Sequence, residues 1–139
     1  MKKVLVLCTA NSCRSQMAEG YLRQFAGNQY VIYSAGIASH GIHPKAIQMM
    51  RADGIDISLQ TSNVLDEYAA IHFDFIITVC DYALESCPVF LQAKKRYHHS
   101  FPDPAKATGS EDEIDEKFRE IRNSIKDYCI SFIAENANT

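Results

Sequence analysis

Cys8 and Arg14 lie at the two ends of a short polar segment that follows an apolar run, and together they could capture an oxyanion. The run Val4–Leu7 is typical of a buried strand, and the residues from Ser15 onward are typical of a helix. Backbone N–H groups before a helix bind anions, and the helix terminus and a nearby arginine lower a cysteine pKa. The guanidinium of Arg14 can hold two oxygens of a tetrahedral oxyanion. We therefore expect a Cys8 thiolate facing an oxyanion bound by Thr9, Ala10, Asn11, Ser12, Cys13, Arg14 and Ser15.

The loop between Cys8 and Arg14 has no glycine, although N–H groups that converge on an anion require left-handed backbone. Asn11 is a residue type that tolerates this conformation. Ser15, at the start of the expected helix, could donate a hydrogen bond to the Cys8 thiolate. The alternative is a buried cysteine and an unrelated surface arginine, but the strand–loop–helix context favours a functional pair.

Strand-like and helix-like segments alternate along the chain. Apolar runs predict strands at residues 4–7, 30–34, 73–79 and 96–100, and helical spacing predicts helices at residues 15–26, 44–53 and 113–134, with a short helix after residue 62 or 63. This order predicts an α/β fold, a single domain over residues 1–139 with an open four-stranded parallel sheet and helices on both faces. Cys8, Cys80 and Asp103 each follow an expected strand, so they should meet at the edge where such sheets bind ligands.

The composition limits the possible partners and the compartment. The chain has 139 residues, 47% of them hydrophobic, and a net charge of −3, which does not favour nucleic acid or an anionic membrane. No segment approaches the roughly 20 apolar residues of a membrane span. Five cysteines without an export signal predict a reducing compartment. We expect a cytoplasmic monomer with no nucleic-acid or membrane partner.

Cys80 and Cys87 flank the segment Asp81–Ser86, directly after the clearest strand-like run. By themselves they could be core thiols, half of a metal site or a redox pair. A zinc site needs two more ligands, and the adjacent His98 and His99 make a poor chelate because neighbours on a strand point to opposite faces. The residues alone leave these interpretations open, with zinc the least favoured.

Asp103 lies between two prolines, Pro102 and Pro104, which make its turn rigid. Such a turn could hold a carboxylate over the anion site. A solvated turn aspartate is the alternative.

The chain resembles the low-molecular-weight phosphotyrosine phosphatase superfamily, and specifically its thioredoxin-coupled arsenate reductase branch. The resemblance extends over nearly the whole chain through these segments: Asn-Ser-Cys-Arg-Ser-Gln-Met-Ala-Glu-Gly (11–20), Tyr-Ser-Ala-Gly (33–36), His-Pro-Lys-Ala-Ile (43–47), Gly-Ile-Asp-Ile-Ser (54–58), Gln-Thr-Ser (60–62), Thr-Val-Cys (78–80), Cys-Pro (87–88) and Phe-Pro-Asp-Pro-Ala (101–105).

The resemblance implies a mechanism for reducing arsenate to arsenite, and hence arsenic detoxification. Cys8 would attack arsenic, Asp103 would assist the leaving oxygen, and Cys80 and Cys87 would complete a disulfide relay that thioredoxin regenerates. It implies no required metal or organic cofactor. Segment 81–86 would have to loop out or unwind for the second exchange.

Some relatives in this branch bind potassium, and the matching residues here are Asn11, Glu19, Ser34 and Thr61. Asn63 stands where the family often has aspartate, which removes a charged oxygen ligand. The phosphatases typically carry aromatic residues after the Asp-Pro pair, whereas this chain has Ala105 and Lys106, which favours a small inorganic substrate.

Two other functions remain as alternatives. A tyrosine phosphatase would use only Cys8, Arg14 and Asp103, and the shared loop predicts weak phosphatase side activity even in a reductase. A non-catalytic oxyanion-binding or thiol-sensing protein would bind arsenate or phosphate without turnover.

Overall fold

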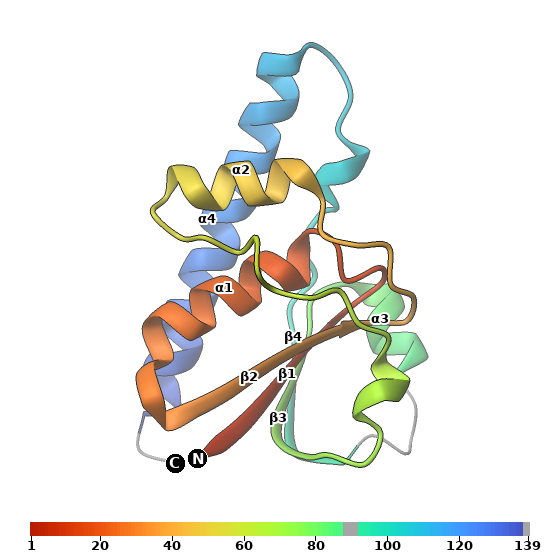
Figure 1. Cartoon of the computed structure of the whole chain (residues 1–139), viewed down its shortest axis with the longest axis vertical. Helices are drawn as coiled ribbons and strands as arrows, with labels where there is room; N and C mark the ends of the chain where they lie inside the picture. Colours follow the sequence, from red (N-terminus) through yellow and green to blue (C-terminus); the bar gives the residue numbers. More distant parts are fainter. Residues whose placement is uncertain (88–91, 138–139) are drawn as a thin grey trace.

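In the computed structural model, which describes residues 1–87 and 92–137, four parallel strands form one sheet (Figure 1). The strands are β1 (Lys2–Cys8), β2 (Tyr30–Gly36), β3 (His72–Thr78) and β4 (Gln92–His98), in the spatial order β2-β1-β3-β4. The central strand β1 pairs with both β2 and β3, and its residues Val4–Leu7 are fully buried. The expected four-stranded parallel sheet is therefore confirmed.

The helices are α1 (Arg14–Ala26), α2 (Pro44–Ala52), α3 (Asp81–Ser86) and α4 (Glu111–Glu135), with short 3-10 helices at Gly27–Gln29, Leu65–Tyr68 and Pro104–Lys106. Local sequence explains where the longer helices begin. Pro44 occupies the first turn of α2, and Ser110 caps α4 through a reciprocal pair of hydrogen bonds with Glu113.

Helices cover both faces of the sheet, as the sequence predicts. Figure 1 shows α1 and α4 on one side, with α3 on the other. On the first face the Phe132 ring of α4 packs edge-on against Phe75 and Tyr97 of the sheet. On the second face Ala83 of α3 is fully buried. Among the described residues, no helix is long and apolar enough to cross a membrane.

The structure differs from the expected elements around the second half of the sheet. Strand β4 spans Gln92–His98 rather than residues 96–100, and α3 was not among the predicted helices. The edge strand β4 is mostly exposed and has a polar sequence, so apolar periodicity gives no signal for its start. Backbone pairing with β3 sets its register.

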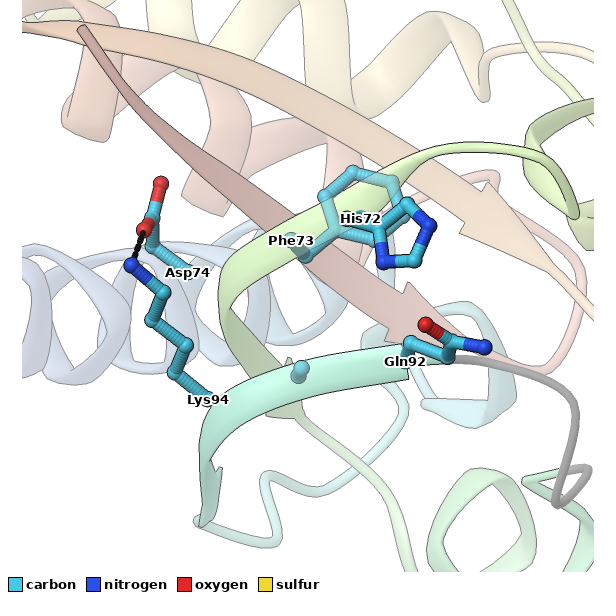
Figure 2. Close-up of a pocket in the computed structure, with 6 residues that line it drawn as sticks. His72, Phe73, Asp74, Gln92 and Lys94 are labelled. Carbon is cyan, nitrogen blue, oxygen red and sulfur yellow. Dashed lines mark ion pairs between the residues drawn. The ribbon is translucent and has the colours of Figure 1, made fainter.

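The amino ends of β3 and β4 border a hollow that no cysteine lines. The hollow, about 380 Å³ in volume, is shown in Figure 2, where Lys94 forms an ion pair with Asp74 at 3.4 Å. Cys8 and Cys80 lie at the opposite edge of the sheet, where β1 and β3 end.

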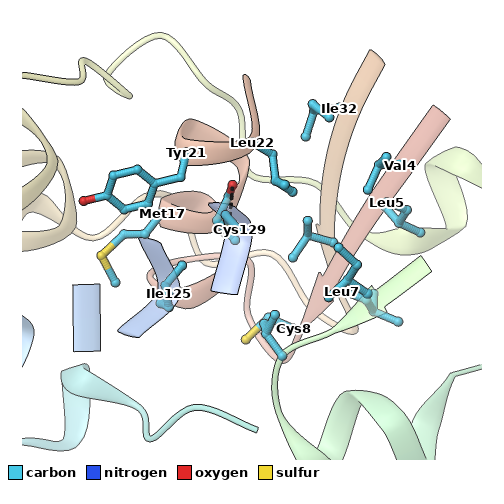
Figure 3. Close-up of a cluster of buried hydrophobic side chains, with 14 of the residues drawn as sticks. Val4, Leu5, Leu7, Cys8, Met17, Tyr21, Leu22, Ile32, Ile125 and Cys129 are labelled. Atoms are coloured by element: carbon cyan, nitrogen blue, oxygen red, sulfur yellow. Dashed lines mark hydrogen bonds between the residues drawn. The ribbon is translucent and has the colours of Figure 1, made fainter. Parts of the chain in front are cut away.

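The hydrophobic core extends from the sheet to α1 and α4 and ends at Cys8 (Figure 3). Leu5 and Leu7 of β1, Met17 of α1 and Ile125 of α4 are all buried. Cys8 is the last residue of β1 and is itself buried, so the packed core fixes the position of the expected nucleophile.

Candidate active site

The buried side chain of Asn11 fixes the conformation of the loop that follows Cys8. Asn11 has a positive φ of 50°, which confirms its expected left-handed conformation. Its fully buried side chain donates to Ser15 Oγ at 2.8 Å and to Ser34 Oγ at 2.9 Å, and accepts from the backbone N–H of Asn63 at 2.8 Å. These contacts make the loop conformation a property of the surrounding fold.

The carbonyl oxygens of the loop are occupied by the segment that follows β2. The N–H groups of Ile37, Ala38, His40 and His43 donate to the carbonyls of Cys8, Thr9, Ala10 and Ser12 at 2.9 to 3.2 Å. In a trans peptide the next N–H points opposite to the carbonyl, so those N–H groups point away from this segment. This orientation leaves them available to an anion on the other side of the loop.

Gly36 makes this close approach possible. A Cβ atom at Gly36 would lie 2.2 Å from the carbonyl oxygen of Ala38 and 2.7 Å from the backbone nitrogen of Asn11. Any larger residue would therefore displace the loop. Gly36 belongs to one of the matching sequence segments, but its close approach to the loop was not predicted.

A pocket of about 320 Å³ opens over the loop. Its lining residues are Cys8, Thr9, Ala10, Ser12, Cys13, Arg14, His40, Asp103, Ala105 and Lys106. Most of the expected oxyanion-binding residues thus line one pocket. The side chains of Asn11 and Ser15 are exceptions, since both are fully buried and outside this lining.

Ser15 does not play the expected role toward Cys8. Its hydroxyl oxygen accepts from Asn11, and within the described residues no hydrogen bond joins it to Cys8. His40 is a pocket residue that sequence analysis missed. It reaches the pocket only through the packing of residues 37–43 on the loop, and no local pattern signals such packing.

Arg14 and Asp103, far apart in sequence, meet at the pocket. Arg14 donates from Nη1 to the carbonyl oxygen of Phe101 at 3.1 Å, and its Nη2 lies 3.7 Å from Asp103 Oδ2. Asp103 Oδ1 also accepts from the backbone N–H of Ala105 at 3.0 Å. The turn that carries Asp103 therefore holds both the carboxylate and the guanidinium in place.

Cys80 lies next to Cys8 because their strands are neighbours. The backbone N–H of Val79 donates to the carbonyl of Leu7 at 3.1 Å, so the two cysteines that follow these residues lie side by side. Thr9 Oγ1 lies 3.2 Å from Cys80 Sγ. The structure therefore brings the first two cysteines of the expected relay into contact.

This contact changes the expected charge distribution. The hydrogen bond to Cys80 and burial raise the pKa of Cys8, and together they outweigh the opposing effect of Arg14. The hydrogen bond from Cys8 lowers the pKa of Cys80, with further contributions from Thr9 and from the backbone of Ala83. In the unliganded pair the pKa of Cys8 is therefore raised and that of Cys80 is lowered, whereas the sequence predicts a lowered pKa for Cys8.

The other cysteines differ from this pair. Cys87 follows α3 at the end of the helix opposite Cys80, and all five cysteines are free thiols. Pro88, which follows Cys87 in the matching segment, lies outside the described residues. Burial, with the nearby Asp103 carboxylate, raises the pKa of Cys13 to about 12, so its thiol is protonated. Cys129 is buried between α4 and α1, where its Sγ contacts the carbonyl of Ala18 at 3.7 Å.

The candidate potassium residues already satisfy one another. Glu19 accepts from Ser34 Oγ at 2.5 Å and from Arg23 Nε at 2.8 Å, and it forms an ion pair with Arg23 Nη2 at 2.7 Å. Asn11 presents its NH₂ group to Ser34 rather than its oxygen. Thr61 donates its hydroxyl hydrogen to Asn63. Glu19, Ser34 and Thr61 nevertheless line one pocket of about 280 Å³, together with Arg23 and Asn63.

No cluster of three or more histidine, cysteine, aspartate or glutamate side chains in the described part of the chain could hold a metal ion. His98, considered as a ligand beside Cys80 and Cys87, instead lies 2.9 Å from Asp81. The residues around Cys80 therefore do not fit the zinc alternative.

Known proteins share this fold and sequence. Residues 3–138 match the family described as low molecular weight phosphotyrosine protein phosphatase. The chain is 44% identical to an arsenate reductase of Halalkalibacterium halodurans and to one of Bacillus subtilis, in each case over 89% of both chains. A solved arsenate reductase in the phosphate binding state is 34% identical, with a TM-score of 0.84 over 97% of this chain and 98% of that chain. A low molecular weight phosphotyrosine phosphatase of Vibrio cholerae O395 shares the fold at 22% identity, with a TM-score of 0.82 over 99% of this chain and 98% of that one.

Proposed function

The chain belongs to the low molecular weight phosphotyrosine protein phosphatase family, and from that premise we propose that it is an arsenate reductase working through three cysteine thiols. The observation that carries the proposal is the position of Cys80 directly beside the loop that begins at Cys8, where its Sγ lies 3.2 Å from Thr9 Oγ1. Phosphate-ester hydrolysis needs one thiol, whereas two thiols in contact can deliver two electrons to a bound oxyanion.

In the first step arsenate binds to the loop N–H groups and to Arg14. Because the thiols of Cys8 and Cys80 are close enough to shift each other's pKa, a proton can pass from Cys8 to Cys80 and leave Cys8 as the thiolate. The Cys8 sulfur then attacks arsenic. A sulfur–arsenic bond forms, an arsenic–oxygen bond breaks, and Asp103 supplies a proton to the oxygen, which leaves as water. Arsenic remains pentavalent in this adduct.

In the second step electrons pass to arsenic. Cys80, after losing its proton, attacks the Cys8 sulfur, the Cys8–Cys80 disulfide forms, and the sulfur–arsenic bond breaks with its electron pair left on arsenic. Trivalent arsenite leaves. Cys87 then attacks Cys80 and frees Cys8 as a thiolate, and the dithiol of thioredoxin reduces the Cys80–Cys87 disulfide.

Several features of the chain support this assignment over a phosphatase. Ala105 and Lys106 line the pocket beside Asp103, where an aryl ester would need a stacking surface. The five free thiols suit a reducing cytoplasm, so we propose that the enzyme is cytoplasmic. Every residue in the mechanism comes from one chain, so we also propose that the enzyme is active as a monomer. Slow aryl phosphate hydrolysis by Cys8, Arg14 and Asp103 remains a side activity within this proposal.

The proposal is tested by arsenate-dependent NADPH consumption. We expect turnover with thioredoxin and thioredoxin reductase, and little with glutathione and glutaredoxin. A rate seen only with glutaredoxin would assign a different reductant. Binding of arsenate without arsenite release under either reductant would instead support the oxyanion-binding alternative. Fast aryl phosphate hydrolysis without arsenate reduction would support the phosphatase.

We further propose that Arg23 neutralises Glu19 and that no potassium ion is needed there. The carboxylate of Glu19 is almost fully buried and already bonded to Ser34 and Arg23. Replacing potassium with choline in the assay buffer, at constant ionic strength, is therefore expected to leave both kcat/KM and Tm unchanged. A Tm that rises with potassium concentration, with no such rise in choline, would contradict this expectation.

A further inference from the structure

Two side chains of the edge strand β4, Arg96 and His98, contact the two ends of α3. They stand two residues apart and share the face of the sheet that carries α3, while Tyr97 between them packs against α4 on the other face. Arg96 Nη1 donates to Cys87 Sγ at 3.1 Å, at the carboxyl end of α3. His98 Nε2 lies 2.9 Å from the Asp81 carboxylate, at its amino end. Strand β4 thus holds the helix at both ends.

The ring of His98 is itself fixed to the sheet. Its Nδ1 lies 2.7 Å from Thr78 Oγ1, at the end of β3. With Nδ1 occupied by this hydroxyl, Nε2 faces Asp81, the residue that directly follows Cys80. The contact therefore holds the chain next to Cys80 and keeps that cysteine beside Cys8.

Helix α3 needs such contacts because it has only six residues. An isolated helix of this length is unstable in water. Ala83 is its buried residue, whereas Tyr82 and Leu84 are about half exposed. The helix therefore has little burial of its own to stabilise it.

The helical state of α3 decides whether Cys87 can reach Cys80. Cys80 and Cys87 flank the helix, and at 1.5 Å per residue its two ends are about 10 Å apart. A disulfide requires Cα atoms within roughly 4.4–6.8 Å. The two cysteines therefore cannot be joined until α3 unwinds.

We propose that Arg96 and His98, which we call the β4 clamp, keep α3 helical and hold Cys87 away until Cys80 has formed its disulfide with Cys8. The inference rests on the proposed thiol relay. When the clamp opens, the Cys87 thiolate attacks the Cys80 sulfur, the Cys80–Cys87 bond forms, the Cys8–Cys80 bond breaks, and Cys8 leaves as a thiolate. Early pairing of Cys80 with Cys87 would leave Cys8 without the partner that releases arsenite.

The test measures direct pairing of Cys80 and Cys87 without arsenate. In a Cys8→Ser background the reduced protein is treated with diamide, which accepts two electrons and two protons as the disulfide forms, and the disulfide is quantified by mass spectrometry after alkylation. We expect Arg96→Met and His98→Phe each to accelerate Cys80–Cys87 formation at least about fivefold, because each removes a hydrogen bond involving a charged partner. Amide hydrogen exchange in residues 81–86 should accelerate with it.

Two further variants separate the clamp from other effects. Lys95→Met removes a positive charge from the neighbouring position of β4 and should leave the diamide rate unchanged, whereas Arg96→Lys retains a donor and should restore most of the slow rate. If Arg96→Met forms the Cys80–Cys87 disulfide no faster than the Cys8→Ser parent, and amide hydrogen exchange in residues 81–86 is also unchanged, the clamp proposal is overturned. Because no arsenic is present, this result is independent of arsenate turnover, and a wild-type protein that releases no arsenite would refute the reductase proposal instead.

Discussion

Replacing Arg14 with lysine is expected to lower kcat/KM for arsenate by roughly 10²- to 10³-fold, the usual cost of removing a preorganised donor to an oxyanion. Lysine keeps the positive charge but loses the planar fork that can bind two oxygens at once. Arg14 is also held by the carbonyl of Phe101 and lies 3.7 Å from Asp103. A lysine ammonium cannot keep both contacts while directing two donors into the pocket.

The measurement compares steady-state kinetics of Arg14→Lys with those of Arg51→Lys. Arg51 lies on α2 with a largely exposed side chain and forms a surface ion pair, 3.9 Å from Asp56. The same chemical change at Arg51 should leave kcat/KM unchanged, and the Tm of both variants should stay near that of the wild type. An Arg14→Lys enzyme within threefold of wild-type kcat/KM would show that the guanidinium fork does not bind the substrate.

Replacing Cys87 with serine is expected to abolish steady-state arsenate reduction while leaving about one arsenite released per enzyme molecule. Cys8 and Cys80 are already in contact, so they can complete the first disulfide without Cys87. A serine hydroxyl cannot attack that disulfide, because exchange requires a thiolate. The enzyme should therefore accumulate as the Cys8–Cys80 disulfide.

A single-turnover measurement of arsenite, combined with mass mapping of the trapped disulfide, checks this expectation. Cys129→Ala provides the matched control, since Cys129 is buried between α1 and α4 and is not among the residues that line the pocket. That variant should recycle with thioredoxin at the wild-type rate. Undiminished steady-state turnover by Cys87→Ser would refute the relay.

Much of the architecture could be predicted because it depends on local patterns. Val4–Leu7 is a continuous apolar run and forms the buried centre of the sheet. Asn11 takes the left-handed conformation that a loop without glycine requires. Strand β4 could not be located in this way, because its exposed sequence has no apolar period and only pairing with β3 fixes its register.

The site residues show a similar division. Cys8 and Asp103 were predicted to share one site because each follows an expected strand, and the structure brings them to the same pocket. His40 and Gly36 were missed as site residues, because their roles arise from packing between loops distant in sequence. Ser15 was assigned to Cys8, but the geometry directs it to Asn11.

The sequence by itself determined the chemical groups of this protein: a cysteine and an arginine around an anion-binding loop, an aspartate between prolines, and a second pair of cysteines. These groups are encoded by residue types and short spacings, which sequence carries directly. Only the tertiary structure decided the direction in which each thiol pKa shifts, because a thiol pKa depends on burial and on its neighbours. Contact between the ends of β1 and β3 lowers the pKa of Cys80 and raises that of Cys8, the reverse of what the loop alone predicts for Cys8.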